Sequence, residues 1–195
     1  MALRGRRMTV GMPDRRTQPV ARRDCSAPLT MTDRDICERF NGGPGLRYGA
    51  RLEGGAPEPL YEPATGASPA IIRYRLDYAQ SALHEIAHWC IAGRERRALA
   101  DYGYWYVPPP RTAKERAQFF VVESRVQGLE ALLAELAGVR FHVSLDDPGA
   151  DAGDFAEHVL QASAMWRATS LPARTVAVMV ALDPEWRSRL GLAPP

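Results

Sequence analysis

One amphipathic segment, Tyr78–Ala92, constrains the fold of this chain more than any other. Its apolar residues recur at the i, i+3, i+4, i+7 and i+8 spacing of a helix with one buried face: Leu83, Ile86, Ala87, Cys90 and Ile91. Gly93 is typical of a helix end, and three of the next four residues are arginines, which suit the negative end of a helix dipole. The sequence therefore predicts a helix that packs this stripe against the core.

The same segment contains the motif His84-Glu85-Ile86-Ala87-His88, which is H-E-x-x-H. Histidines at i and i+4 lie one turn apart on one helix face, so both imidazoles can bind one ion at about 2.0–2.1 Å. Glu85 points roughly 100° away around the helix, where it can act as a base or orient a neighbouring group. Both histidines border the buried stripe, where polar groups need partners. The motif thus predicts a divalent metal ion at His84 and His88.

Two histidines leave an ion under-coordinated, so a third ligand must come from elsewhere in the chain. We choose Glu123, because it follows the apolar run Phe119–Val122 in a second predicted helix, and a carboxylate buried in this way needs a cation. The alternative is a glutamate that faces solvent. Weaker candidates for the third ligand are Asp101, His142 and Asp146.

This ligand set leaves the chemistry open. Zinc bound by two histidines and a carboxylate makes a hydrolase, whereas Fe(II) with open positions for oxygen makes an oxygenase. The spacing alone favours a zinc metallopeptidase of the gluzincin type, in which Glu85 would be the general base acting on zinc-bound water. A third possibility is a binding module whose degenerate site grips a partner without catalysis.

The other patterns predict the helices and strands of one domain, from residue 31 to residue 195. Helices are expected at Thr32–Phe40, from Thr112 to about Ala137 with Gly138 as its end, at Asp154–Ala168, and in two short segments after Pro172 and Pro184. Extended structure is expected in Leu46–Leu52, Leu60–Tyr61, Ile71–Arg75, Tyr102–Val107 and Arg140–Ser144. The buried stripe of the long helix is expected to comprise Val122, Val126, Leu129, Leu133 and Leu136.

Residues 1–30 differ in composition from the rest of the chain. They hold seven arginines and two acidic residues, whereas the remainder is slightly acidic. We interpret this segment as a disordered basic extension. It lacks the apolar stretch of a secretory signal, and no run in the chain approaches the roughly 20 apolar residues that span a bilayer. The three cysteines form no CxxC pair, which favours a reduced, cytosolic chain.

The surroundings of the motif add a more specific signal. The run Ser81–Gly93 is followed by Arg96-Arg97 and by Asp101–Tyr106, which reads DYGYWY. Later pieces are Gln118-Phe119, Val122-Glu123 and Gln127, and then Phe141 and Val143-Ser144 before Asp146. Together these residues resemble the elongation factor P hydroxylase family. The resemblance covers roughly residues 33 to 190, and its specific part is 78 to 147.

The resemblance implies a bacterial enzyme that hydroxylates a lysine of translation elongation factor P, usually after that lysine has received a β-lysyl group. It implies a non-haem Fe(II) held by two histidines and a glutamate, which at the matching positions are His84, His88 and Glu123. Zinc can occupy the same ligands in a purified sample. Glu85 would orient a histidine, a water or the substrate. The resemblance does not decide whether 2-oxoglutarate takes part.

The fold implied is α+β and zincin-like, with the H-E-x-x-H helix packed on a small mixed sheet and further helices around it. Elongation factor P would be the protein partner, and the site of action the cytoplasm. Neither direct nucleic-acid binding nor membrane association is expected.

A lysine side chain is a long cation, so its pocket requires aromatic walls and a carboxylate. We expect the walls to come from Tyr102, Tyr104, Trp105 and Tyr106, and the negative charge from Asp101 or Asp146. The alternative for the aromatic residues is that every second one belongs to the core.

Overall fold

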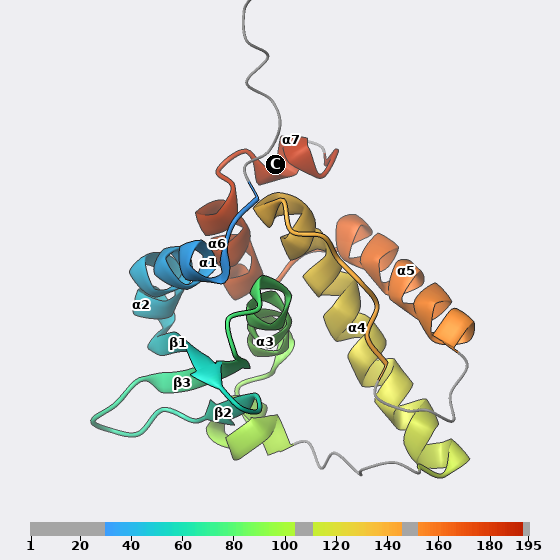
Figure 1. The fold of residues 1–195 in the computed structure, drawn as a ribbon, viewed down its shortest axis with the longest axis horizontal. Helices are drawn as coiled ribbons and strands as arrows, with labels where there is room; N and C mark the ends of the chain where they lie inside the picture. The colour runs from blue at the N-terminus through green and yellow to red at the C-terminus, as the bar shows by residue number, and fades with distance from the viewer. Residues whose placement is uncertain (1–29, 104–110, 146–151, 193–195) are drawn as a thin grey trace, which may run out of the picture.

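The structure is a computed structural model, and it describes residues 30–103, 111–145 and 152–192. The first part contains α1 (Asp33–Phe40), the π-helical turn η1 (Asn41–Gly45), α2 (Leu46–Tyr48), β1 (Ala50–Ala56), β2 (Leu60–Glu62) and β3 (Ala70–Arg75). Then come α3 (Ala79–Ile91), the 3-10 turns η2 (Arg96–Ala98) and η3 (Ala100–Gly103), α4 (Ala113–Ala137), α5 (Ala152–Ala168), α6 (Ala173–Leu182) and α7 (Trp186–Arg189). The arrangement is α+β (Figure 1), as predicted.

The described residues form one small mixed sheet. Strand β3 lies at its centre, parallel to β1 and antiparallel to β2. The prediction that β-structure begins at Leu46 is wrong, because the helical turns after α1 continue to Tyr48. Gly49 then adopts a left-handed φ of 64°, and β1 starts directly after it. Glycine takes this conformation without steric cost, so it marks where the helical turns end.

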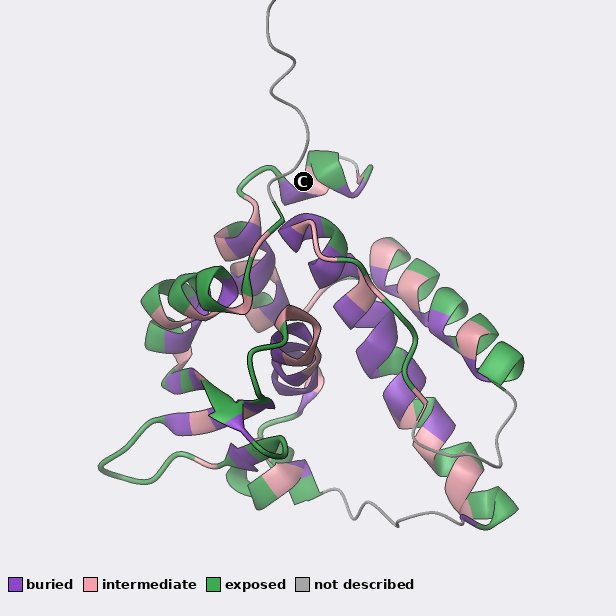
Figure 2. Cartoon of the chain, in the orientation of Figure 1, coloured by how far each residue is buried: buried purple, intermediate pink, exposed green. Residues whose placement is uncertain are grey.

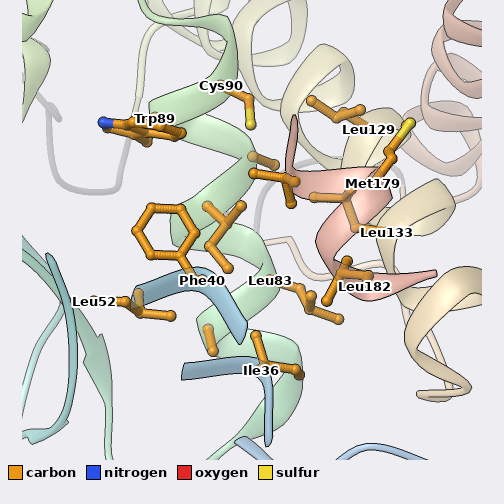
Figure 3. Close-up of a cluster of buried hydrophobic side chains, with 14 of the residues drawn as sticks. Ile36, Phe40, Leu52, Leu83, Trp89, Cys90, Leu129, Leu133, Met179 and Leu182 are labelled. Atoms are coloured by element: carbon orange, nitrogen blue, oxygen red, sulfur yellow. The ribbon is translucent and has the colours of Figure 1, made fainter. Parts of the chain in front are cut away.

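Helix α3 lies at the centre of the molecule and packs against β3, α1, α4 and α6. Figure 2 shows it surrounded by the other elements and largely buried. Its apolar side meets a cluster drawn in Figure 3, which joins side chains of five elements: Leu83, Trp89 and Cys90 of α3, Ile36 and Phe40 of α1, Leu52 of β1, Leu129 and Leu133 of α4, and Met179 and Leu182 of α6. The buried stripe predicted for this helix is therefore confirmed, apart from Ile91, which is half-buried.

The C-terminal end of α3 is stabilised by two arginines. Arg97, one of the arginines expected there, donates to the carbonyl of Ala92. Arg174, which begins the distant helix α6, donates to the carbonyls of Cys90 (3.0 Å) and Ala92 (2.7 Å), and its guanidinium lies over the ring of Trp89. These contacts satisfy carbonyls that a helix end leaves unpaired. They also tie α6 to the helix that carries the histidines.

Helix α4 begins and ends where the sequence predicts. Thr112 and Glu115 form a capping box, in which the Thr112 hydroxyl accepts the Glu115 amide and the Glu115 carboxylate accepts the Thr112 amide. Gly138 ends the helix with a left-handed φ of 64°. Helix α5 packs closely along α4 at Gly128, where an added Cβ would lie 2.7 Å from the Cβ of Ala162.

In the described part of the chain, no helix is long and apolar enough to span a membrane.

The segment after α4, Val139–Leu145, runs back beside that helix (Figure 1), and we name it the strap. The strand expected at Arg140–Ser144 is wrong, because no neighbouring strand pairs with it in the described residues. Two glutamines hold the strap instead. Gln127 of α4 donates to the carbonyl of Ser144 and accepts its amide, and Gln80 of α3 donates to the carbonyl of His142. The side-chain amide of Gln127 thus replaces the backbone of a neighbouring strand.

The aromatic segment expected to be extended from Tyr102 to Val107 is only partly described. Its first two residues belong to turn η3, where Tyr102 has a φ of 57°. That left-handed conformation is incompatible with a strand, so the expectation is wrong at this position. Tyr104, Trp105 and Tyr106 lie outside the described residues, as does Asp146.

Candidate metal centre

Helices α3 and α4 bring His84, His88 and Glu123 together. One ligand atom from each residue falls in a cluster in which all lie within 4.8 Å of one another. The two Nε2 atoms are 3.2 Å apart, Nε2 of His88 is 3.4 Å from Oε1 of Glu123, and Nε2 of His84 is 3.7 Å from Oε2 of Glu123. Donors about 2.1 Å from a tetrahedral ion lie roughly 3.4 Å from each other, so these separations fit a single divalent ion.

Burial makes this cluster unlike a surface histidine pair. His88 and Glu123 are each 4% exposed, and only His84 reaches solvent, through about a quarter of its side chain. Burial and the charge on His84 together hold the pKa of His88 well below its usual value. Burial also lowers the pKa of His84, but the hydrogen bond and negative charge of Glu130 outweigh it and raise that pKa to about 10. The site therefore favours positive charge at His84.

Glu130 is a functional candidate that the sequence interpretation missed. Its Oε2 lies 2.8 Å from Nδ1 of His84, and its side chain is 1% exposed. It follows Glu123 by seven residues, which is two helical turns, so both carboxylates lie on the same face of α4. The signal that could have revealed it is this seven-residue spacing, which puts a second glutamate on the helix face of Glu123.

Glu85 is also buried, with 8% of its surface exposed, and it lines the same cleft as the two histidines. Burial raises its pKa to about 7, against the opposing effect of His84 and with help from the charges of Glu123 and Glu130. No atom of Glu85 belongs to the ligand cluster of the described residues. Glu85 thus lines the cleft beside the cluster without belonging to it, and its role stays a prediction.

The cluster lies in the wall of a cleft of about 1180 Å³. One side of the cleft is aromatic: the ring of Tyr102 stacks on Tyr61 at 4.0 Å between centroids and lies nearly parallel to the ring of His88 at 6.0 Å. Tyr61 was not expected at the site, although it lies on an expected strand. Tyr102 was expected as a pocket wall, and it both lines the cleft and packs into the core.

Asp101 and His142 line the cleft without joining the cluster. Oδ1 of Asp101 accepts the amide of Tyr61 at 2.9 Å, so this carboxylate anchors strand β2 to turn η3. Because Asp101 also faces the cleft, its expected role toward a cationic substrate stays a prediction. His142, a weaker ligand candidate, is exposed on the strap. Asp146 and the three aromatic residues after Gly103 fall outside the described part of the chain.

Comparison with known proteins assigns the family. A family model described as elongation factor P hydroxylase matches residues 40–191. The chain belongs to the elongation factor P hydroxylase family. A relative from Haemophilus influenzae that is named elongation factor P lysine hydroxylase is 39% identical over 152 residues, which cover 76% of this chain and 85% of the relative. The elongation factor P hydroxylase match spans both α3 and α4, so the whole ligand cluster lies within it.

Proposed function

We propose that this protein hydroxylates the side chain of a lysine on elongation factor P, with one non-haem Fe(II) bound by His84, His88 and Glu123. The observation that carries the proposal is the cluster of two histidines and one carboxylate, two of them buried, on the wall of an aromatic cleft. The name of the Haemophilus influenzae relative supplies the substrate and the reaction. Two histidines and a carboxylate on one side of an iron leave positions open for oxygen.

The arrangement around the metal is zincin-like in our interpretation. A helix with H-E-x-x-H packs beside a small mixed sheet, and the third ligand comes from the next long helix. When bound, Fe(II) would supply the oxygen chemistry that converts a C–H bond of the lysine side chain to C–OH: one atom of O₂ enters the product, and the other is reduced by two electrons from a co-substrate or an external reductant. Glu123 contributes the negative charge that distinguishes this ligand set from histidines alone, and burial shields Glu123 and His88 from bulk water.

The cleft provides the remaining functions of the proposed site. The stacked rings of Tyr61 and Tyr102 give a flat apolar wall for a long alkyl chain, and aromatic faces attract an ammonium group. Asp101 adds negative charge to the same cleft. Glu85 is placed to hydrogen-bond a water or a substrate group close to the histidines. Tyr104, Trp105, Tyr106 and Asp146 remain predicted substrate contacts, and the protein would act in the cytoplasm, on a translation factor.

Only the spacing of the H-E-x-x-H motif favours the zinc metallopeptidase, and no observation favours the non-catalytic binding module. The ligand geometry suits zinc as well as iron, so geometry alone does not separate the enzymes. The relative is named a hydroxylase, and this is what favours oxygenation over peptide cleavage.

The test is to incubate Fe(II)-loaded protein with β-lysylated elongation factor P and an electron source (2-oxoglutarate in one set, ascorbate in another) in air and in ¹⁸O₂, and to measure the intact mass of the factor. We expect the mass of one added oxygen atom, heavier by the isotope difference in ¹⁸O₂, and peptide mapping should place it on the modified lysine. His84→Ala should abolish the product. His158→Ala is the matched control, because His158 is an exposed histidine on α5.

Three outcomes would refute the proposal. The first is an unchanged mass with the iron-loaded enzyme, and the second is cleavage of the factor. The third is equal activity of the zinc-loaded and iron-loaded proteins, because zinc has no redox chemistry.

A further inference from the structure

Glu130 makes a contact that the ligand cluster does not explain. Its Oε2 lies 2.8 Å from Nδ1 of His84, whereas the cluster uses Nε2 of the same ring. The two nitrogens point to different sides of the imidazole, so Glu130 lies on the side of His84 away from Glu123 and His88. Glu130 is therefore not a fourth member of the cluster. It contacts His84 through the ring nitrogen that the cluster does not use.

The burial of Glu130 carries a cost that nothing else in its surroundings offsets. The side chain is 1% exposed, and its second oxygen, Oε1, has no hydrogen-bond partner among the described residues. A buried carboxylate with a single partner is destabilising relative to an apolar residue of similar size. Its neighbours along the helix, Leu129 and Leu132, are core residues. The one interaction that Glu130 does make therefore accounts for its presence at this position.

We propose that Glu130 is a positioning residue for the metal centre: it accepts the Nδ1 proton of His84 and so directs Nε2 of that histidine toward the metal. This inference rests on the proposed metal site. Once Nε2 binds an ion, the remaining proton of His84 is on Nδ1, and Glu130 is its acceptor. The hydrogen bond fixes the ring orientation and makes Nε2 a stronger donor, an effect of carboxylates behind metal-binding histidines that is worth about 10- to 100-fold in metal affinity.

His84 is the ligand that most needs such support. His88 is 4% exposed and its ring is packed parallel to Tyr102, but about a quarter of the His84 side chain faces the cleft. A ring with a free side can rotate away from the ion. The hydrogen bond that His84 donates to Glu130, a residue of helix α4, restricts that rotation.

The experiment measures metal affinity directly, without turnover. Co(II) and Zn(II) are titrated into metal-free protein by calorimetry with chelator competition, for wild type, Glu130→Gln and Glu135→Gln. Glutamine keeps an oxygen that can accept the Nδ1 proton but removes the charge, so Glu130→Gln should bind about 10- to 100-fold more weakly. Glu135 lies on the same helix but is exposed, so Glu135→Gln should bind like wild type.

A second readout separates positioning from a general loss of structure. In the Zn(II)-loaded wild type, the Nδ1 proton of His84 should appear as a far-downfield NMR resonance, and Glu130→Gln should move it upfield. Glu130→Leu removes the acceptor and should abolish the resonance. Circular dichroism checks that each protein is folded before titration.

The possible results distinguish this inference from the proposed function. If the wild type binds metal and folded Glu130→Gln binds it with unchanged affinity, the positioning role is refuted while the metal centre stands. If Glu130→Gln changes the Co(II) absorption bands to those of a site that has lost a ligand, Glu130 is itself a ligand and the inference is wrong. If the wild type binds neither ion, the metal centre itself is refuted.

Discussion

Helix α4 has two buried stripes at the same helical spacing, and they differ in everything except burial. One is polar and comprises Glu123, Gln127 and Glu130; the other is apolar and includes Val126, Leu129, Leu133 and Leu136. The apolar stripe packs into the cluster of Figure 3, where many weak contacts stabilise the fold. Each polar residue instead has a specific partner. Glu123 lies beside the histidine pair, Gln127 binds the strap, and Glu130 contacts Nδ1 of His84.

Burial on this helix therefore serves two purposes. The apolar stripe contributes free energy that is independent of any ligand. The polar stripe costs desolvation energy in the absence of specific partners, and we propose that a metal ion recovers part of that cost. Substitutions in the two stripes should therefore act on different measurable quantities.

The largest effect should come from Glu123→Gln in the polar stripe. We expect metal affinity to fall by more than about 100-fold. Removing a residue that hydrogen-bonds a metal ligand lowers affinity by about 10- to 100-fold, and removing a ligand itself should lower it further. The melting temperature of the wild type should rise when metal is added, since a ligand that binds only the folded state stabilises it. Thermal denaturation with and without Zn(II) should show this rise in the wild type and in Glu157→Gln, an exposed control on α5, but not in Glu123→Gln. A normal metal-dependent rise in Glu123→Gln would remove Glu123 from the ligand set.

Leu133→Ala in the apolar stripe should have the opposite profile. Leu133 is fully buried, so the free energy of unfolding should fall by about 2–5 kcal/mol. The melting temperature should fall equally with and without metal, leaving the metal-dependent rise unchanged. Leu160→Ala is the control, because Leu160 on α5 is 71% exposed and its loss should change stability by less than about 0.5 kcal/mol. A loss of metal affinity in folded Leu133→Ala would show that the two stripes are not independent.

Gln127→Ala tests the member of the polar stripe that binds the strap rather than a histidine of the proposed metal centre. It removes both hydrogen bonds to Ser144, so stability should fall by about 1–3 kcal/mol. Hydrogen–deuterium exchange should become faster at the Ser144 amide and in the rest of the strap. Gln161→Ala, which changes an exposed residue of α5, should leave that exchange unchanged. If the strap exchanges equally fast in wild type and Gln127→Ala, the glutamine does not hold it.

The smallest effect should come from Thr112→Ala, which belongs to neither stripe. It removes the capping box of α4 and should cost about 1 kcal/mol, measured by urea denaturation. Because the cap lies outside both stripes, metal affinity should remain that of the wild type. Thr169→Ala, which loses only an exposed hydrogen bond from its hydroxyl to the carbonyl of Met165 at the end of α5, should cost less. An equal or greater loss for Thr169→Ala would show that the cap contributes little.

Local rules were sufficient for the long helices α3, α4 and α5 and for placing two of the three proposed ligands on one helix face, but not for the helical turns before β1. The capping box at Thr112 and the glycine at 138 define α4, and the four-residue spacing of His84 and His88 places two donors on one face without any tertiary information. Glu123 was predicted from its apolar neighbours alone. These inferences depend only on residues near in sequence, and the role of the three residues as metal ligands stays a prediction.

The roles of Glu130 and Gln127 and the conformation of the strap depend on tertiary contacts. Hydropathy cannot distinguish a polar stripe that faces solvent from one that faces a second helix, so Glu130 was missed and Gln127 had no assigned role. The strap was mistaken for a strand, because extended sequences need a neighbouring strand and the sequence does not say whether one exists. The packing of α3 against α4 determines the contact of Glu130 with His84, and it also places the two glutamines that hold the strap.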